Sequence, residues 1–129
     1  MKTLPKENVQ YPFLKSLDEH SNIRIVRLKG PINMNTLPEI QAFREKLRAQ
    51  PEFRSKHVLV DFQEVTHVDT SAVAGMILVM AEMKATHHHL GIIHADQSLI
   101  ERIKLLKLQK IISLYSTETE ALQTLNSLR

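Results

Sequence analysis

The chain has 129 residues and no cysteine, and its formal net charge is +3 with the histidines neutral. This length suits one domain with a core of its own. The lack of cysteine excludes a disulfide framework, a thiol nucleophile and a thiolate metal site. The small excess of positive charge is spread along the chain, so we expect no nucleic-acid partner.

The N-terminus is polar and lacks the long apolar stretch of a signal peptide. The longest run of small and apolar residues, 72–81, is about half as long as a membrane span. We therefore expect a cytoplasmic protein with no membrane span, in which residues 1–12 are an N-terminal extension and residues 13–129 form one domain.

Two strands are predicted at the start of this domain. Residues 11–17 are typical of an edge strand, where a proline is tolerated, and residues 18–22 indicate a turn. Residues 23–28 are rich in β-branched side chains and predict a second strand, which Gly30 and Pro31 are expected to end.

A helix and a buried strand follow. Apolar residues recur at helical spacing over residues 37–47, with Asn35 or Thr36 as a cap and Pro51 beyond the end. Residues 57–62 are almost continuously apolar, as a central strand of a parallel sheet requires when both of its faces are covered.

The remaining elements continue this alternation. An apolar stripe over residues 73–83 predicts a helix, and residues 90–95 predict a third buried strand. A further helix is predicted by four apolar residues that share one face, Leu99, Ile100, Ile103 and Leu106. Residues 111–115 and 118–128 predict a final strand and a final helix.

Alternating strands and helices with short connections predict the α/β class. We expect a single domain with a mixed sheet of four or five strands, packed with three to four helices. The two N-terminal strands are expected to pair antiparallel, and the strands from residue 57 onward to be largely parallel.

The chemically informative residues are Asp69, Thr70 and Ser71, which open the helix after the central strand. A helix N-terminus has unpaired N–H groups and a partial positive charge. A phosphate on Ser71 would be stabilised there, yet it would place about two negative charges on any docking surface. On the residues alone, a simple helix cap is the more economical interpretation, because caps are common and phosphorylation sites are rare.

Residues 58–62 and 68–73 together resemble the STAS family, which is named for sulfate transporters and anti-sigma factor antagonists. Its pattern is a strand ending in Asp, a loop, an apolar residue, and then Asp-Ser-Ser/Thr-Gly-Leu at the start of a helix. The segment Val-Asp-Thr-Ser-Ala-Val at 68–73 matches this signature, with Ala72 and Val73 in place of the usual glycine and leucine.

The rest of the chain is similar to the family in its order of elements. Residues 25–30 resemble the early strand and its glycine, residues 90–93 a later strand, and residues 106–108 the end of a basic helix. The resemblance covers roughly residues 13–127, which is nearly the whole chain.

The resemblance implies a regulatory protein-binding domain of the anti-sigma factor antagonist type. In such proteins the unmodified form binds an anti-sigma factor that is also a serine kinase, phosphorylation ends binding, and a phosphatase restores it. Ser71 matches the phosphorylated position, and Thr70 is the less favoured neighbour. The implied partner surface is Asp69, Thr70, Ser71, Ala72 and Met76, where the methyl group of Ala72 would lie beside the hydroxyl and hinder a kinase. We expect a monomer or a weak homodimer.

Two other functions stay open. One is an adaptor or scaffold STAS subunit of a transporter or stress-signalling complex without a phosphate cycle. The Gly30-Pro31 step resembles transporter-type domains and favours this alternative. The other is a small-ligand or anion sensor that uses the same helix end.

We expect no enzyme and no cofactor, because the chain has no nucleophile elbow, Walker loop or dinucleotide-binding turn. We expect no metal at His87–His89, because no carboxylate or cysteine lies at ligand spacing. His57, His67 and His94 are interpreted as surface or hydrogen-bonded core residues, and the basic residues within 102–107 as a solvated face.

Overall fold

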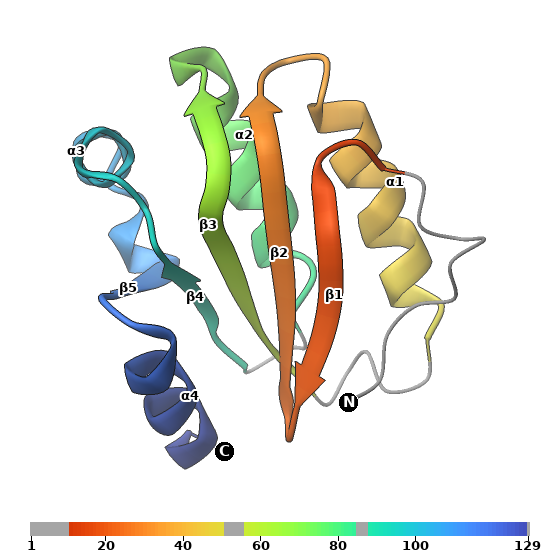
Figure 1. Cartoon of the computed structure of the whole chain (residues 1–129), viewed down its shortest axis with the longest axis vertical. Coiled ribbons are helices and arrows are strands. Elements are labelled where there is room, and N and C mark those ends of the chain that lie inside the picture. The colour runs from red at the N-terminus through yellow and green to blue at the C-terminus, as the bar shows by residue number, and fades with distance from the viewer. Residues whose placement is uncertain (1–10, 51–55, 85–87, 129) are drawn as a thin grey trace.

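The computed structural model describes residues 11–50, 56–84 and 88–128. Five strands form one sheet in the order β1-β2-β3-β4-β5. Helices α1, α2 and α3 cover one face of this sheet, and α4 packs on the other (Figure 1). The predicted α/β class and mixed sheet are therefore confirmed.

The helices and strands alternate along the chain after an N-terminal hairpin. In order they are β1 (Leu14–His20), β2 (Ile23–Ile32), α1 (Leu37–Arg48), β3 (His57–Val68), α2 (Thr70–Ala81), β4 (Leu90–Ile93), α3 (Gln97–Leu105), the short 3-10 helix η3 (Leu108–Lys110), β5 (Ile112–Tyr115) and α4 (Glu118–Ser127). Strands β1 and β2 are antiparallel, and every other neighbouring pair is parallel.

The two central strands are longer than the sequence patterns predict. β2 passes through Gly30 and Pro31 instead of ending there, because Gly30 adopts φ +72° between shifts in the strand register. The extra residues of β2 pair with β3 as far as Ile32 opposite Val68. This pairing extends β3 well beyond residue 62, and it places the start of α2 beside the ends of β2 and β3.

Other boundaries shift for local reasons. β1 begins at Leu14 and continues to His20, so the predicted five-residue turn is reduced to Ser21 and Asn22. β4 ends at Ile93 because the next residue, His94, has φ +60° and leaves the strand conformation.

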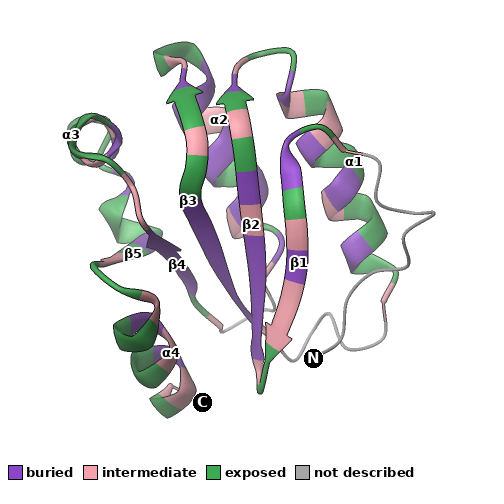
Figure 2. Cartoon of the chain, in the orientation of Figure 1, coloured by how far each residue is buried: buried purple, intermediate pink, exposed green. Residues whose placement is uncertain are grey.

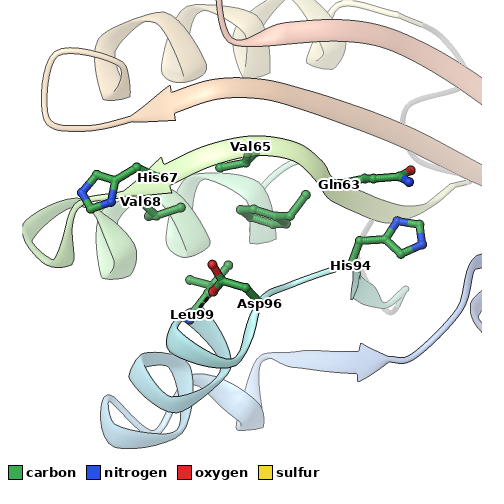
Figure 3. Close-up of a pocket in the computed structure, with 8 residues that line it drawn as sticks. Gln63, Val65, His67, Val68, His94, Asp96 and Leu99 are labelled. Atoms are coloured by element: carbon green, nitrogen blue, oxygen red, sulfur yellow. Dashed lines mark hydrogen bonds between the residues drawn. The ribbon is translucent and has the colours of Figure 1, made fainter.

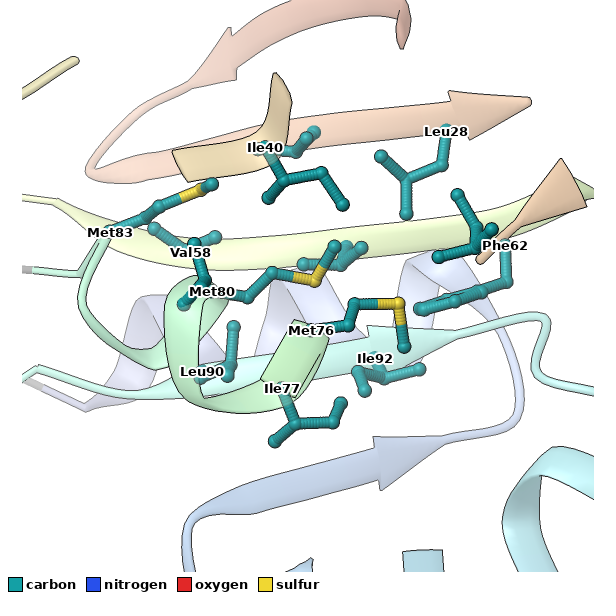
Figure 4. Close-up of a cluster of buried hydrophobic side chains, with 14 of the residues drawn as sticks. Leu28, Ile40, Val58, Phe62, Met76, Ile77, Met80, Met83, Leu90 and Ile92 are labelled. Atoms are coloured by element: carbon teal, nitrogen blue, oxygen red, sulfur yellow. The ribbon is translucent and has the colours of Figure 1, made fainter. Parts of the chain in front are cut away.

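The core lies mainly between the sheet and helices α1 to α3. Figure 4 shows Phe62 of β3 and Ile92 of β4 packed against Met76 and Met80 of α2, and Figure 2 shows the same buried band along the central strands. A smaller cluster packs beneath α4: Ile23, Ile25, Leu59, Ile93, Ala121 and Leu125.

One residue predicted to face the core is exposed, and some predictions concern residues that the structure does not describe. Leu106, predicted to face the core, is exposed, because α3 ends at Leu105 and Lys107 turns the chain with φ +58°. Residues 1–10 of the predicted extension and Pro51 lie outside the described residues. Within the described ranges no helix is long and apolar enough to cross a bilayer.

Candidate functional site

The candidate site lies where the chain leaves β3 and enters α2. Asp69 is the single residue between the two elements, and its backbone is extended, with φ −66° and ψ 138°. The Asp69 amide donates to the carbonyl of Ile32 at the end of β2 over 2.9 Å. This bond fixes the start of α2 against the two central strands, so the residues that follow are held on a rigid support.

Thr70 and Ser71 are exposed as the first two residues of α2. Ala72 and Met76, which the family resemblance also implied as partner contacts, are 0% exposed. A partner cannot touch either side chain in this conformation. The Ala72 methyl is buried in the protein interior, so it is not on the surface beside the Ser71 hydroxyl, contrary to the expected obstruction.

The N-terminus of α2 carries no side-chain cap. The Asp69 carboxylate instead accepts a hydrogen bond from His67, with Nε2 and Oδ1 2.6 Å apart. The first turn of α2 also contains no acidic residue. Thr70 and Ser71 therefore lie at the positive end of the helix dipole, with no side chain capping that end.

Arg102 of α3 belongs to this site, although the sequence patterns placed it on a solvated face. Its guanidinium donates to the carbonyl of Val68, and its Nη1 lies 3.5 Å from Oγ1 of Thr70. No feature of the basic segment separates Arg102 from its lysine neighbours. Its position depends on how α3 packs beside the start of α2, which a sequence pattern does not specify.

A pocket of about 120 Å³ lies between the end of β3 and the start of α3 (Figure 3). His67 and Val68 line one side of it, and Asp96 and Leu99 the other. The Asp96 carboxylate caps α3 by accepting from the Leu99 amide over 2.8 Å. The negative charge of this carboxylate would repel an anionic ligand. The pocket is also smaller than the volume of about 300 Å³ at which typical ligand pockets begin.

A polar network lies on the other face of the sheet and ties its elements together. Arg27 of β2 binds Asp18 over 2.9 Å, Asp61 over 2.8 Å and Glu118 over 2.8 Å. Because an ionised carboxylate can only accept, Nδ1 of His94 donates to Asp61 in a 2.8 Å hydrogen bond. His94 is thus hydrogen-bonded, as its interpretation as a partnered residue requires.

This network shifts the pKa values of three of its members. The hydrogen bond with Glu118 is the main cause that raises the pKa of Arg27. Burial raises the pKa of Asp61, but the hydrogen bonds from His94, the Gln63 amide and Arg27 outweigh it, so that pKa is lowered overall. The pKa of Glu118 is lowered chiefly by its hydrogen bond with Arg27. All three groups are therefore held in their charged forms.

The histidines do not form a metal centre among the residues that the structure describes, where no group of three or more histidine or carboxylate side chains could hold an ion. His87 lies outside those residues. His57 is buried and packs near its two described neighbours, with ring centroids 4.6 Å from His88 and 5.5 Å from His89.

A family model of the STAS domain matches residues 15–121. The chain belongs to the STAS domain family. No curated protein matches its sequence. The family resemblance carried by the Asp69-Thr70-Ser71 segment is therefore confirmed, and the STAS domain accounts for the described sheet and for most of its helices.

Solved structures share the fold of this STAS domain at low sequence identity. An anti-sigma factor antagonist from Mycobacterium paratuberculosis has a TM-score of 0.67 and 20% identity, over 85% of this chain and 91% of that one. The phosphorylated form of the Bacillus cell fate determinant SpoIIAA has a TM-score of 0.60 and 17% identity, over 84% and 96%. An anti-sigma factor antagonist (STAS) domain protein from Planctomyces limnophilus has a TM-score of 0.62 and 14% identity, over 84% and 94%. These likenesses show a common fold.

Proposed function

We propose that this STAS domain is a cytoplasmic regulatory protein that binds an anti-sigma factor kinase and is released when Ser71 is phosphorylated. The observation that carries the proposal is the exposure of Ser71 in the first turn of α2, a turn without a capping side chain or an acidic residue. The role is reversible binding, and the chemistry of phosphate transfer belongs to the partner kinase and to a phosphatase.

The position of Ser71 suits a switch that leaves the domain folded. A phosphate there lies at the positive end of the helix dipole, which stabilises an anion. The same phosphate adds about two negative charges to the docking surface. A partner surface that fits the neutral hydroxyl then has to desolvate a dianion without a matching cation.

The contacts of Arg102 favour Ser71 over Thr70 as the effective residue. Consecutive helix residues point about 100° apart, and Arg102 lies beside the Thr70 hydroxyl. A phosphate on Thr70 would therefore be partly neutralised within the domain. A phosphate on Ser71 projects in another direction, so more of its charge would act on the partner.

Two exposed apolar side chains extend the proposed surface beyond Ser71. Leu78 follows Ser71 by seven residues, which places both on one face of the helix, and Leu78 is 52% exposed. Met34 is 53% exposed and follows Ile32, whose strand position is paired with Val68 at the same sheet edge. Leu78 and Met34 replace Ala72 and Met76 as the apolar contacts that we propose.

The test uses candidate anti-sigma factor kinases expressed together with the full chain and supplied with ATP. We expect mass spectrometry to place one phosphate on Ser71, and Ser71→Ala to remove it while binding persists. Ser71→Asp should weaken binding by about tenfold or more, the effect of an unmatched charge in an interface.

Thr119→Asp is the matched control for this substitution. Thr119 is exposed and is also the second residue of a helix, α4, so the control repeats the charge and the helix position on the opposite face of the sheet. Equal binding by wild type and Ser71→Asp would reject the switch. Loss of binding on Leu78→Lys would then point to an adaptor role through the same helix face.

A further inference from the structure

A second and larger pocket lies at the opposite end of the sheet, where β4 and β5 begin. Its volume is about 430 Å³, within the range of small-molecule sites. Four of the described residues that line it are basic, Lys84, His88, His89 and Lys110, and none is acidic. The whole chain holds 17 lysines and arginines and 14 acidic residues, so this is a strong local bias.

The two lysines of this pocket have no counter-charge among the described residues. Neither Lys84 nor Lys110 forms an ion pair with any residue in the ranges that the structure describes. Glu82 is the acidic residue closest to Lys84 along the chain, and its carboxylate is engaged by Arg44. Two like charges that line one concave space repel each other, and an anion held between them offsets this repulsion.

Buried His57 holds the histidine side of the pocket in place. Its Nδ1 accepts from the His89 amide over 2.9 Å, and its Nε2 lies 2.7 Å from the carbonyl of Leu128. An amide can only donate and a carbonyl can only accept, so His57 is neutral with its proton on Nε2. His57 is therefore a positioning residue that fixes the backbone of His89 at the pocket.

We propose that this pocket binds the phosphate group of a small anionic ligand. Lys84 and Lys110 supply the charge that neutralises the phosphate, and His89 supplies a ring nitrogen as a hydrogen-bond donor. Ile111, which is 37% exposed, gives the ligand an apolar contact. The phosphate belongs either to a soluble organic phosphate or to a phospholipid headgroup.

This site is separate from the surface around Ser71. Leu90 at the pocket pairs with Val58 of β3, whereas α2 begins after Val68. Ten residues of extended strand span about 33 Å. A ligand in the pocket leaves the proposed partner surface untouched, so failure of either proposal does not decide the other.

Titration with pyrophosphate, followed by amide chemical shifts of the full chain, tests the site. Sodium chloride keeps the ionic strength constant, so that general screening does not change. We expect saturable shifts at Lys84, His88, His89 and Lys110. The double variant Lys84→Gln/Lys110→Gln should bind about tenfold more weakly or worse, since each charged hydrogen bond contributes appreciably.

The matched control is Lys104→Gln/Lys107→Gln, which removes the same charge from exposed positions outside the pocket. It should bind pyrophosphate within about twofold of wild type, as screened charges at a distance have little effect. Absence of saturable shifts, or equal weakening by both double variants, would overturn the proposal.

Vesicles distinguish the two sources of the phosphate. Sedimentation with phosphatidylcholine vesicles, with and without phosphatidylglycerol, is compared for the wild type and Lys84→Gln/Lys110→Gln. Binding to the anionic vesicles that the double variant loses assigns the site to a headgroup, and binding to pyrophosphate alone assigns it to a soluble phosphate. Vesicle binding that the double variant retains, without pyrophosphate binding, contradicts the site.

Discussion

Nη1 of Arg27 donates to Oδ2 of Asp61 over 2.8 Å and joins β2 to β3 on the sheet face that carries α4. The same guanidinium binds Asp18 of β1 and Glu118 of α4. One cation therefore connects four elements and separates three carboxylates. Removal of its charge leaves those carboxylates close together without compensation.

Arg27→Met should destabilise the domain by about 2–3 kcal/mol, somewhat less than the loss of a fully buried ion-pair partner. The Arg27 side chain is 19% exposed, so solvent reduces the effect. Urea denaturation measures the change in the free energy of unfolding. The control is Arg48→Met, whose contact with Glu45 is exposed and should matter by less than about 0.5 kcal/mol. Equal effects of the two substitutions would contradict the role of Arg27.

Acidification should weaken the fold through Asp61 and Glu118. Both have a lowered pKa in the folded state, so the unfolded chain takes up protons first as the pH falls. The stability that they contribute is fully present above their unfolded values of about 4 and is lost as the pH falls through the folded values.

Urea midpoints between pH 5 and pH 2 measure this loss. Glu118→Gln should show a shallower fall than wild type, because its side chain no longer titrates. Glu45→Gln, on the exposed surface of α1, is the control and should follow wild type. A steeper fall in Glu118→Gln would reject the assignment.

His57 should produce a separate pH effect. Burial is the main cause that lowers its pKa, and the nearby His88 and His89 lower it further. The unfolded histidine therefore binds a proton first, and stability falls as the pH drops below the unfolded value of about 6.5. His57→Gln keeps a donor for Leu128 and an acceptor for His89, so stability between pH 7 and pH 5 should become flatter. Exposed His20→Gln should leave the slope unchanged, and a slope that persists in His57→Gln would exclude His57 as its source.

The order and type of the elements follow from local patterns, whereas their ends depend on distant partners. Periodicity predicts α1 and α2 because their buried faces are local to the sequence. The continuation of β2 through Pro31 requires the matching residues of β3, which lie more than thirty positions away. The exposure of Leu106 likewise depends on a left-handed Lys107 that no sequence signal marks.

The candidate site likewise contains residues that a local motif predicts and residues whose positions depend on tertiary packing. The signature residues Asp69 to Ser71 could be predicted because a local motif places them at a helix start. Arg102 could not, because it reaches the site from α3 across a tertiary contact. The inward position of Ala72 and the outward position of Leu78 follow from the rotation of α2. Because α2 is apolar on nearly all sides, the stripe over residues 73–83 does not by itself decide on which side these two residues lie.

Gly91→Ala should destabilise the domain by about 1–3 kcal/mol through overpacking. A Cβ at this position would lie 2.8 Å from Cε2 of Tyr115 and 3.2 Å from Cδ1 of Leu59. Gly75→Ala is the comparison, because its Cβ would meet only the flexible end of Leu37 at 3.0 Å or more. The gain in helix propensity of about 1 kcal/mol should make that change neutral or stabilising. Thermal unfolding of both variants decides the order, and a more stable Gly91→Ala would show that β4 has room beneath α4.

Ser71→Asp should leave the domain folded and stabilise it slightly, by about 0.3–1 kcal/mol. The added carboxylate lies in the first turn of α2, which holds no other acidic residue, and it interacts favourably with the helix dipole. Because this interaction is electrostatic, the gain should shrink at about 1 M salt, where screening acts over roughly 3 Å.

Urea denaturation at low and high salt compares this variant with Thr119→Asp. Thr117 already caps α4, and Glu118 and Glu120 lie in its first turn, so a further carboxylate there should contribute less. A loss of more than about 1 kcal/mol in Ser71→Asp would be the size of a disrupted helix start. Loss of partner binding could then be explained by damage to α2, and a charge switch acting on an intact surface would no longer be needed.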